Sequence, residues 1–242
     1  MLTEKNTRKS DKGIFFDIGH TLCYPVSNDW RLTKKFYDSI DMNIFHTLGK
    51  ERIVHAISES LRFLNEHHRL WTVEEEYEQN IDAYKILADC LPELHLPDER
   101  IRDIAYDRTY NMDNYCFYDG LKELFQRLSP KYKIGIISDT WPSADNVLRQ
   151  AGIYEYIDTF TYSCNLGVCK PNPAMFSDAV EKMGIAPENT IFVDDSEKNL
   201  EAAAALGMNP VMILTRSDKS QNGYPVIHRI SEMETAIDYY FG

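Results

Sequence analysis

The pattern of apolar and polar positions divides the chain into three parts with different periodicities. Near the start, Ile14–Phe16 is a continuous apolar run without helical spacing, which predicts a strand buried on both faces. Between Pro25 and Asn114, apolar residues recur at helical spacing and no strand pattern occurs. From Phe117 onward, apolar runs alternate with amphipathic segments, which predicts a succession of strands and helices.

The alternating part predicts the order of its elements. Strands are expected at 132–138, 159–163, 190–195 and 210–214, and helices at 121–128, 144–151, 173–184, 199–206 and 231–240. Repeated strand–helix units connect in a right-handed sense into a parallel sheet. The sequence therefore predicts an α/β fold, with a Rossmann-like parallel sheet that carries helices on both faces.

The middle part predicts an all-helical subdomain inserted after the first strand. Thr72, followed three residues later by Glu75, is the pattern of a capping box that begins a helix reaching Leu91. A further helix is expected from Pro97 to about Tyr110. We therefore expect two domains, which are a Rossmann-like core formed by 1–23 and 114–242 and a helical subdomain formed by 24–113.

Composition and charge restrict the classes of partner that the protein can bind, and they say less about its fold. The 242 residues carry a net charge of −12 without any lysine- or arginine-rich run, which argues against nucleic acid as a principal partner. No stretch approaches the roughly 18 apolar residues of a membrane span, and Met1–Lys12 lacks the apolar core of a signal peptide. The five cysteines form no CxxC pair, which favours reduced thiols. We expect a cytoplasmic monomer or homodimer.

Polar residues stand where three of the predicted strands end. Asp17 follows the first strand, Ser138 and Asp139 close the second, and Asp194 and Asp195 close the fourth. A single aspartate before a glycine would be interpreted as a turn residue. Because the carboxyl ends of parallel strands meet at one edge of the sheet, three such endings predict a site there.

The residue types at this edge suit phosphoryl transfer. Carboxylate oxygens that leave an open position for substrate favour Mg²⁺, and a carboxylate beside that cation can act as a nucleophile. Ser138 offers a hydroxyl, and Lys170 offers an ammonium from a loop that Pro171 and Pro173 make rigid. Both groups can hold phosphoryl oxygens and screen their charge.

Four segments, taken in chain order, resemble the motifs of the haloacid dehalogenase-like hydrolases. They are Asp-Ile-Gly-His-Thr at 17–21, Ile-Ile-Ser-Asp at 136–139, Lys-Pro-Asn-Pro at 170–173 and Val-Asp-Asp-Ser-Glu-Lys-Asn at 193–199. The helical block resembles the cap that these enzymes carry after the first strand. The resemblance covers the chain after residue 12 and implies a Mg²⁺-dependent hydrolase, most often a phosphatase, for a small phosphorylated metabolite.

The resemblance implies a role for each matching residue. Asp17 is the implied nucleophile and a metal ligand, and the backbone carbonyl of Gly19 is a second ligand. Asp195 is implied to bind the metal directly, and Asp194 directly or through water. The residues implied around the phosphate are Ser138, Asp139 and Lys170, with Asn199 as a brace of the metal-binding loop.

The first motif departs from the family pattern at its third position. Phosphatases of the family usually have a second aspartate there, which protonates the leaving group and then activates water. This chain has Gly19 instead, and a group of that kind contributes about 10²–10⁴ in rate. His20, where the family usually has glycine, is a candidate replacement because histidine transfers protons near neutral pH. The alternative is a loop histidine bonded to neighbouring backbone.

Three functional interpretations remain open. The first is a Mg²⁺-dependent phosphatase that forms an aspartyl-phosphate on Asp17 and takes its acid from His20, the cap or the substrate. The second is a phosphonate or haloacid hydrolase. Family dehalogenases do not need Mg²⁺, so the retained Asp194 and Asp195 argue against that branch, and no lysine matches the Schiff-base motif of the phosphonate branch. The third is a family member without activity that binds a phosphorylated ligand or a protein.

Overall fold

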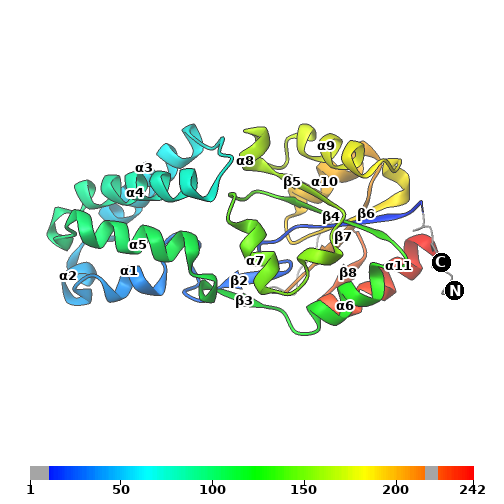
Figure 1. Cartoon of the computed structure of the whole chain (residues 1–242), viewed down its shortest axis with the longest axis horizontal. Coiled ribbons are helices and arrows are strands. Elements are labelled where there is room, and N and C mark those ends of the chain that lie inside the picture. The colour runs from blue at the N-terminus through cyan, green and yellow to red at the C-terminus, as the bar shows by residue number, and fades with distance from the viewer. Residues whose placement is uncertain (1–10, 216–222) are drawn as a thin grey trace, which may run out of the picture. The chain divides into compact units, whose positions relative to one another are not determined.

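The chain folds into two compact units in a computed structural model that describes residues 11–215 and 223–242 (Figure 1). The sheet unit comprises the described residues up to 24, then 117–140 and those from 148 onward, and the helical unit comprises 25–116 and 141–147. Residues 1–10 of the polar N-terminal segment lie outside the described part. The sequence placed its domain borders after 23 and after 113, and did not separate 141–147 from the core.

Six strands form the sheet of the sheet unit. They are β1 (Gly13–Phe16), β4 (Lys133–Ser138), β5 (Thr159–Tyr162), β6 (Thr190–Asp194), β7 (Asn209–Ile213) and β8 (Val226–Ile227). Their order is β5-β4-β1-β6-β7-β8, and each pair is parallel. All residues of β1 are buried, as expected for a strand covered on both faces. These findings confirm the predicted α/β class and the parallel sheet.

Helices cover both faces of this sheet (Figure 1). On one side lie α9 (Pro173–Met183) and α10 (Glu197–Leu206), and on the other lie α6 (Leu121–Leu128) and α11 (Met233–Phe241). Two further helices, α7 (Ala144–Gln150) and α8 (Ser163–Leu166), follow β4 and β5. The limits of the expected strands and helices agree with the sequence prediction to within two residues, and the four-residue α8 and the two-residue β8 were not expected.

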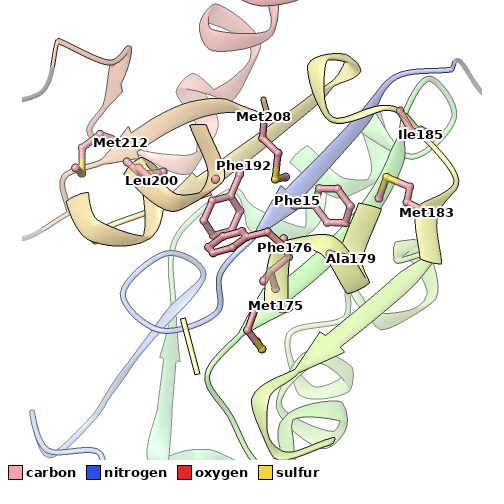
Figure 2. Packing of buried hydrophobic residues seen from close by; sticks show 12 residues of the cluster. Phe15, Met175, Phe176, Ala179, Met183, Ile185, Phe192, Leu200, Met208 and Met212 are labelled. Atoms are coloured by element: carbon pink, nitrogen blue, oxygen red, sulfur yellow. The ribbon is translucent and has the colours of Figure 1, made fainter. Parts of the chain in front are cut away.

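Neighbouring phenylalanines of β1 anchor the strand to both helical layers. Figure 2 shows the rings of Phe15, Phe176 and Phe192 gathered in one cluster, and Phe176 meets Phe192 edge-on at 5.5 Å between centroids. On the opposite face, the ring centroid of Phe16 lies 5.1 Å from that of Phe125 in α6. Successive side chains of a strand point to opposite faces, and each buried ring contributes roughly 1.5–3 kcal/mol. Asp17, the next residue, is therefore held at a firmly anchored strand end.

The helical unit contains α1 (Lys34–Asp38), α2 (Met42–Thr47), α3 (Lys50–Glu66), α4 (Val73–Cys90) and α5 (Asp98–Tyr110). The predicted capping box is confirmed, because the Glu75 N–H donates to Thr72 Oγ1 at 3.1 Å and Glu75 Oε2 accepts from the Thr72 N–H at 3.1 Å. These helices enclose a separate apolar core that includes Phe36, Ile81 and Ile104.

The segment 141–147 is tied to the helical unit by a buried carboxylate. Glu76 of α4 accepts hydrogen bonds from the Ser143 N–H at 2.7 Å and from Ser143 Oγ at 2.8 Å. Two short strands, β2 (Cys23–Pro25) and β3 (Tyr115–Phe117), form a separate two-stranded sheet at the points where the chain passes between units. The sequence did not predict them, because three residues are too few to show an alternating pattern.

Two further observations concern the cysteines and the apolar character of the helices. No disulfide joins any of the cysteines, all five of which lie in the described part of the chain. Within residues 11–215 and 223–242, no helix combines the length and the apolar character that crossing a membrane requires.

We predict that Gly135→Ala destabilises the sheet unit. Gly135 pairs in register with Phe15 on one side and with Thr159 on the other. A Cβ at this position would lie 2.4 Å from two ring carbons of Phe15 and 2.7 Å from Thr159 Oγ1. Because Phe15 is packed on all sides, we expect a loss of about 2 kcal/mol or more, or roughly 4–8 °C in Tm.

Thermal unfolding followed by circular dichroism measures this loss. Gly49→Ala is the control, because an added Cβ there meets no atom within 4 Å and the exchange of the helix N-cap costs less than about 1 kcal/mol. Equal Tm values for the two variants would show that the β1–β4–β5 register is wrong.

Candidate active site

The carboxyl edge of the sheet brings three of the sequence-predicted residues into direct contact. Lys170 Nζ lies 2.7 Å from Asp17 Oδ1 and 2.7 Å from Asp194 Oδ2, and all three side chains are buried. Burial alone would lower the pKa of Lys170, but the charges of Asp17 and Asp194 outweigh it and hold this pKa above its ordinary value. The lysine therefore stays charged and links the ends of β1 and β6.

Asp194 is engaged by several donors at once. Besides Lys170, its carboxylate accepts from the Ser196 N–H at 2.7 Å and from Asn199 Nδ2 at 3.0 and 3.2 Å. Asn199 lies in α10, at the place where the sequence suggested a brace for this loop. Burial raises the pKa of Asp194, and the nearby Asp17 raises it further.

Asp195 completes a cluster of three carboxylates. One ligand oxygen from each of Asp17, Asp194 and Asp195 lies within 4.8 Å of the others, and Asp195 is the exposed member. Partial desolvation, with the charges of Asp194 and Asp17, raises the pKa of Asp195 to about 7. Three carboxylates around one ammonium leave two negative charges, and hard oxygen donors of this kind fit a divalent cation such as Mg²⁺.

The second motif sits at the end of β4, beside β1. Ser138 is buried at the last position of this strand. Asp139 Oδ1 accepts a hydrogen bond from the Lys170 N–H at 2.8 Å, so it fixes the backbone of the loop that carries the lysine. Burial raises the pKa of Asp139. The structure thus attaches the second motif to the third through a side-chain contact that the sequence did not specify.

The turn of the first motif places its left-handed residue at His20. His20 has φ 56°, and its N–H donates to the carbonyl of Cys23 at 2.7 Å, while the Leu22 N–H donates to Ile18 at 2.9 Å. Gly19 is absent from the described residues with positive φ. A left-handed conformation costs a non-glycine residue roughly 1–2 kcal/mol. The left-handed position of this turn favours glycine, and this chain holds a histidine there.

Three residues near the site were not identified from the sequence. Thr215 Oγ1 donates to the carbonyl of His20 at 3.0 Å, and Tyr118 Oη lies 2.8 Å from Thr215 Oγ1. The ring of Phe192 lies 5.4 Å from Lys170 Nζ. Thr215 directly follows the fifth predicted strand, so a polar residue at one more strand end was the available signal. Phe192 is an ordinary core residue in the pattern, and nothing in the sequence distinguishes it.

The four motif segments thus converge on one edge of a single parallel sheet. A family profile described as haloacid dehalogenase-like hydrolase matches residues 12–207. The chain belongs to the haloacid dehalogenase-like hydrolases. This confirms the resemblance noted in the sequence. Hydrolases of this family generally use Mg²⁺, in agreement with the carboxylate cluster.

Three similar proteins illustrate this membership. A glyceraldehyde 3-phosphate phosphatase from Methanopyrus kandleri is 26% identical over 226 residues, which cover 88% of each protein. A 2-haloacid dehalogenase from Pseudomonas syringae is 16% identical, with a TM-score of 0.62 over 95% of this chain and 99% of that one. A family enzyme from Bacteroides thetaiotaomicron, solved with magnesium and inorganic phosphate, is 21% identical, with a TM-score of 0.57 over 86% of this hydrolase and 97% of that chain.

We predict that Asp195→Asn stabilises this hydrolase in EDTA at pH 8. Its pKa is about 7 in the folded chain against an ordinary 3.8, so the folded state holds a proton that the unfolded state lacks between these values. The stability that depends on this proton is fully present below pH 3.8, falls as pH rises from 3.8 to about 7, and is lost above that value. The full shift corresponds to about 4 kcal/mol, and solvent screening of the exposed side chain reduces this to about 1 kcal/mol.

Thermal unfolding in EDTA should therefore show the variant about 2–4 °C above the native chain at pH 8, and less than half of that difference at pH 5, which lies only about one pH unit above the ordinary pKa of 3.8. Asp119→Asn, an exposed site with the same chemical change, serves as the control. A difference of equal size at both pH values would contradict the repulsion among the three carboxylates.

Proposed function

We propose that this hydrolase is a Mg²⁺-dependent phosphatase that acts on a small phosphorylated metabolite through an aspartyl-phosphate on Asp17. The observation that carries the proposal is the buried Lys170 ammonium, 2.7 Å from both Asp17 and Asp194, with the Asp195 carboxylate in the same cluster. The phosphatase of Methanopyrus kandleri, similar along most of its length, supports this reaction class.

The carboxylate cluster would hold the metal. Asp17 and Asp195 would be direct ligands, together with the backbone carbonyl of Gly19. Asp194 already accepts hydrogen bonds from Lys170, Ser196 and Asn199, so we assign it a positioning role or a contact through water. When bound, Mg²⁺ would neutralise the phosphoryl charge as the nucleophile approaches.

The chain's own residues would carry the reaction. Lys170 engages Oδ1 of Asp17, which leaves Oδ2 to attack phosphorus while the bond to the leaving oxygen breaks. The Lys170 ammonium and the Ser138 hydroxyl would hold the phosphoryl oxygens. Water would then hydrolyse the acyl phosphate and restore the Asp17 carboxylate.

The composition of the first motif shapes the choice of leaving group. Gly19 supplies no acid, and the backbone of His20 is held by hydrogen bonds to Cys23 and Thr215. We propose that aryl and acyl phosphates, whose leaving groups need little protonation, are better substrates than alkyl phosphates. We further propose that the helical unit acts as a cap that selects the substrate. The retained carboxylate cluster favours this chemistry over carbon–halogen cleavage, because family dehalogenases do not need Mg²⁺.

We predict that Asp17→Asn abolishes hydrolysis of para-nitrophenyl phosphate in Mg²⁺, because an amide is a poor nucleophile and a poor metal ligand. Release of para-nitrophenolate measures the rate, and Asp119→Asn controls for the loss of one carboxylate elsewhere. Activity that survives EDTA would refute the Mg²⁺ mechanism. Phosphate binding without turnover on aryl and acyl phosphates would favour a family member that binds its ligand without catalysis.

We also predict that Gly19→Asp raises kcat on alkyl phosphates by at least about tenfold, because it restores a general acid that contributes 10²–10⁴ in such enzymes. Gly19 does not have the left-handed backbone that would exclude a side chain. Gly19→Asn provides a side chain of matched size without an acid and should give no gain. Equal rates for native chain, Asp variant and Asn variant would show that another group already supplies the proton.

A further inference from the structure

A second group of charged side chains, whose donor atoms are buried, lies within the helical unit. Arg31 precedes α1, Arg108 belongs to α5, and Trp141 opens the segment 141–147. The guanidinium carbons of Arg31 and Arg108 lie 5.3 and 5.8 Å from the centre of the Trp141 ring. Two positive charges therefore lie against one indole ring. Such an arrangement requires nearby negative charge or hydrogen-bond acceptors to offset their repulsion.

The neighbours of these arginines compensate them incompletely. Arg31 Nη2 donates to Asn80 Oδ1 at 2.7 Å, and Arg108 Nη1 donates to Tyr115 Oη at 2.9 Å, so both acceptors are neutral. Glu76 supplies one negative charge that acts on both arginines, while its carboxylate accepts its hydrogen bonds from the Ser143 N–H and Oγ, so two positive charges face one negative charge. Burial, followed by the charge of Arg108, lowers the pKa of Arg31 to about 10.

Three buried donors in this group have no acceptor in the described part of the chain. They are Arg31 Nη1, Arg108 Nε and Trp141 Nε1. Buried N–H groups almost always have partners, and those of charged groups need them most. Three such donors on side chains that contact one another indicate a missing acceptor that carries negative charge.

We propose that Arg31, Arg108 and Trp141 form an oxyanion-binding site for a carboxylate or phosphate group. Guanidinium groups match both anions because their N–H donors form a planar fork, and the indole N–H adds a further directed donor. The segment that supplies Trp141 begins two residues after Asp139 in the sequence, so it continues directly from the second motif.

The oxyanion has two possible sources with the same chemistry. It is a second anionic group of the substrate, a version that rests on the phosphatase function proposed above, or it is a free anion that binds whether or not catalysis occurs. A binding measurement and a kinetic measurement together separate these sources.

The binding measurement uses Trp141 as its own reporter in the full chain. Trp30→Phe and Trp71→Phe remove the other two tryptophans, and Asp17→Asn prevents turnover. The probes are inorganic phosphate and a series of carboxyalkyl phosphates with one to four methylene groups. We expect a saturable change in fluorescence, with affinity weakened at least about tenfold by Arg108→Gln.

Arg102→Gln is the matched control, because Arg102 is an exposed residue of the same helix and its loss changes the net charge equally. It should weaken binding less than twofold. Arg108→Lys keeps the charge without the planar fork and tests the site if the Gln variant does not fold; it should also weaken binding. Equal affinities for the Arg108 and Arg102 variants, or no saturable signal with any probe, would overturn the proposal.

The kinetic measurement compares carboxyalkyl phosphates with hydroxyalkyl phosphates of the same length. If the substrate supplies the oxyanion, Arg31→Gln and Arg108→Gln lower the ratio of their kcat/KM values at least about tenfold, and Arg102→Gln does not. If inorganic phosphate alone gives the Trp141 signal and the ratio is unchanged, the source is a free anion. Binding without any turnover would refute the phosphatase function while the oxyanion site stands.

Discussion

One buried ion pair network decides how the sheet edge is built. The ammonium of Lys170 meets carboxylates from the ends of β1 and β6, and its backbone N–H meets Asp139 at the end of β4. A buried lysine without these partners would lose its charge, and the carboxylates without the lysine would repel one another. The fold brings these like charges together, and the network holds them there although a surplus of negative charge remains.

Much of this arrangement is encoded in local sequence. The alternation of apolar runs and amphipathic segments predicts the strands and helices, since burial on one or two faces leaves a periodic trace. Asp17, Ser138 and Asp194 follow such runs directly, so the rule that parallel strands share a carboxyl edge is enough to predict their convergence. Lys170 lies in a loop and has no periodic signal, and only its motif identified it.

The features that the sequence did not predict arise from tertiary packing. The assignment of 141–147 to the helical unit depends on the buried contact between Glu76 and Ser143, which are far apart in the chain. The hydrogen bond from Thr215 to the His20 carbonyl likewise joins residues from opposite ends of the sequence. Neither contact changes the local pattern of apolar and polar residues. The backbone angles also leave no trace in this pattern. The left-handed residue of the first motif is His20, although a glycine, Gly19, precedes it directly.

The two-segment construction of the helical unit has a consequence for engineering chimeric enzymes. A graft that exchanges only 25–116 would remove Glu76 and leave Ser143 behind in the recipient, or bring Glu76 without the donors that solvate it. A buried carboxylate stripped of its donors is among the most destabilising changes in a protein interior. The transferable module is therefore discontinuous, and moving the helical unit between relatives requires 141–147 together with the long insertion.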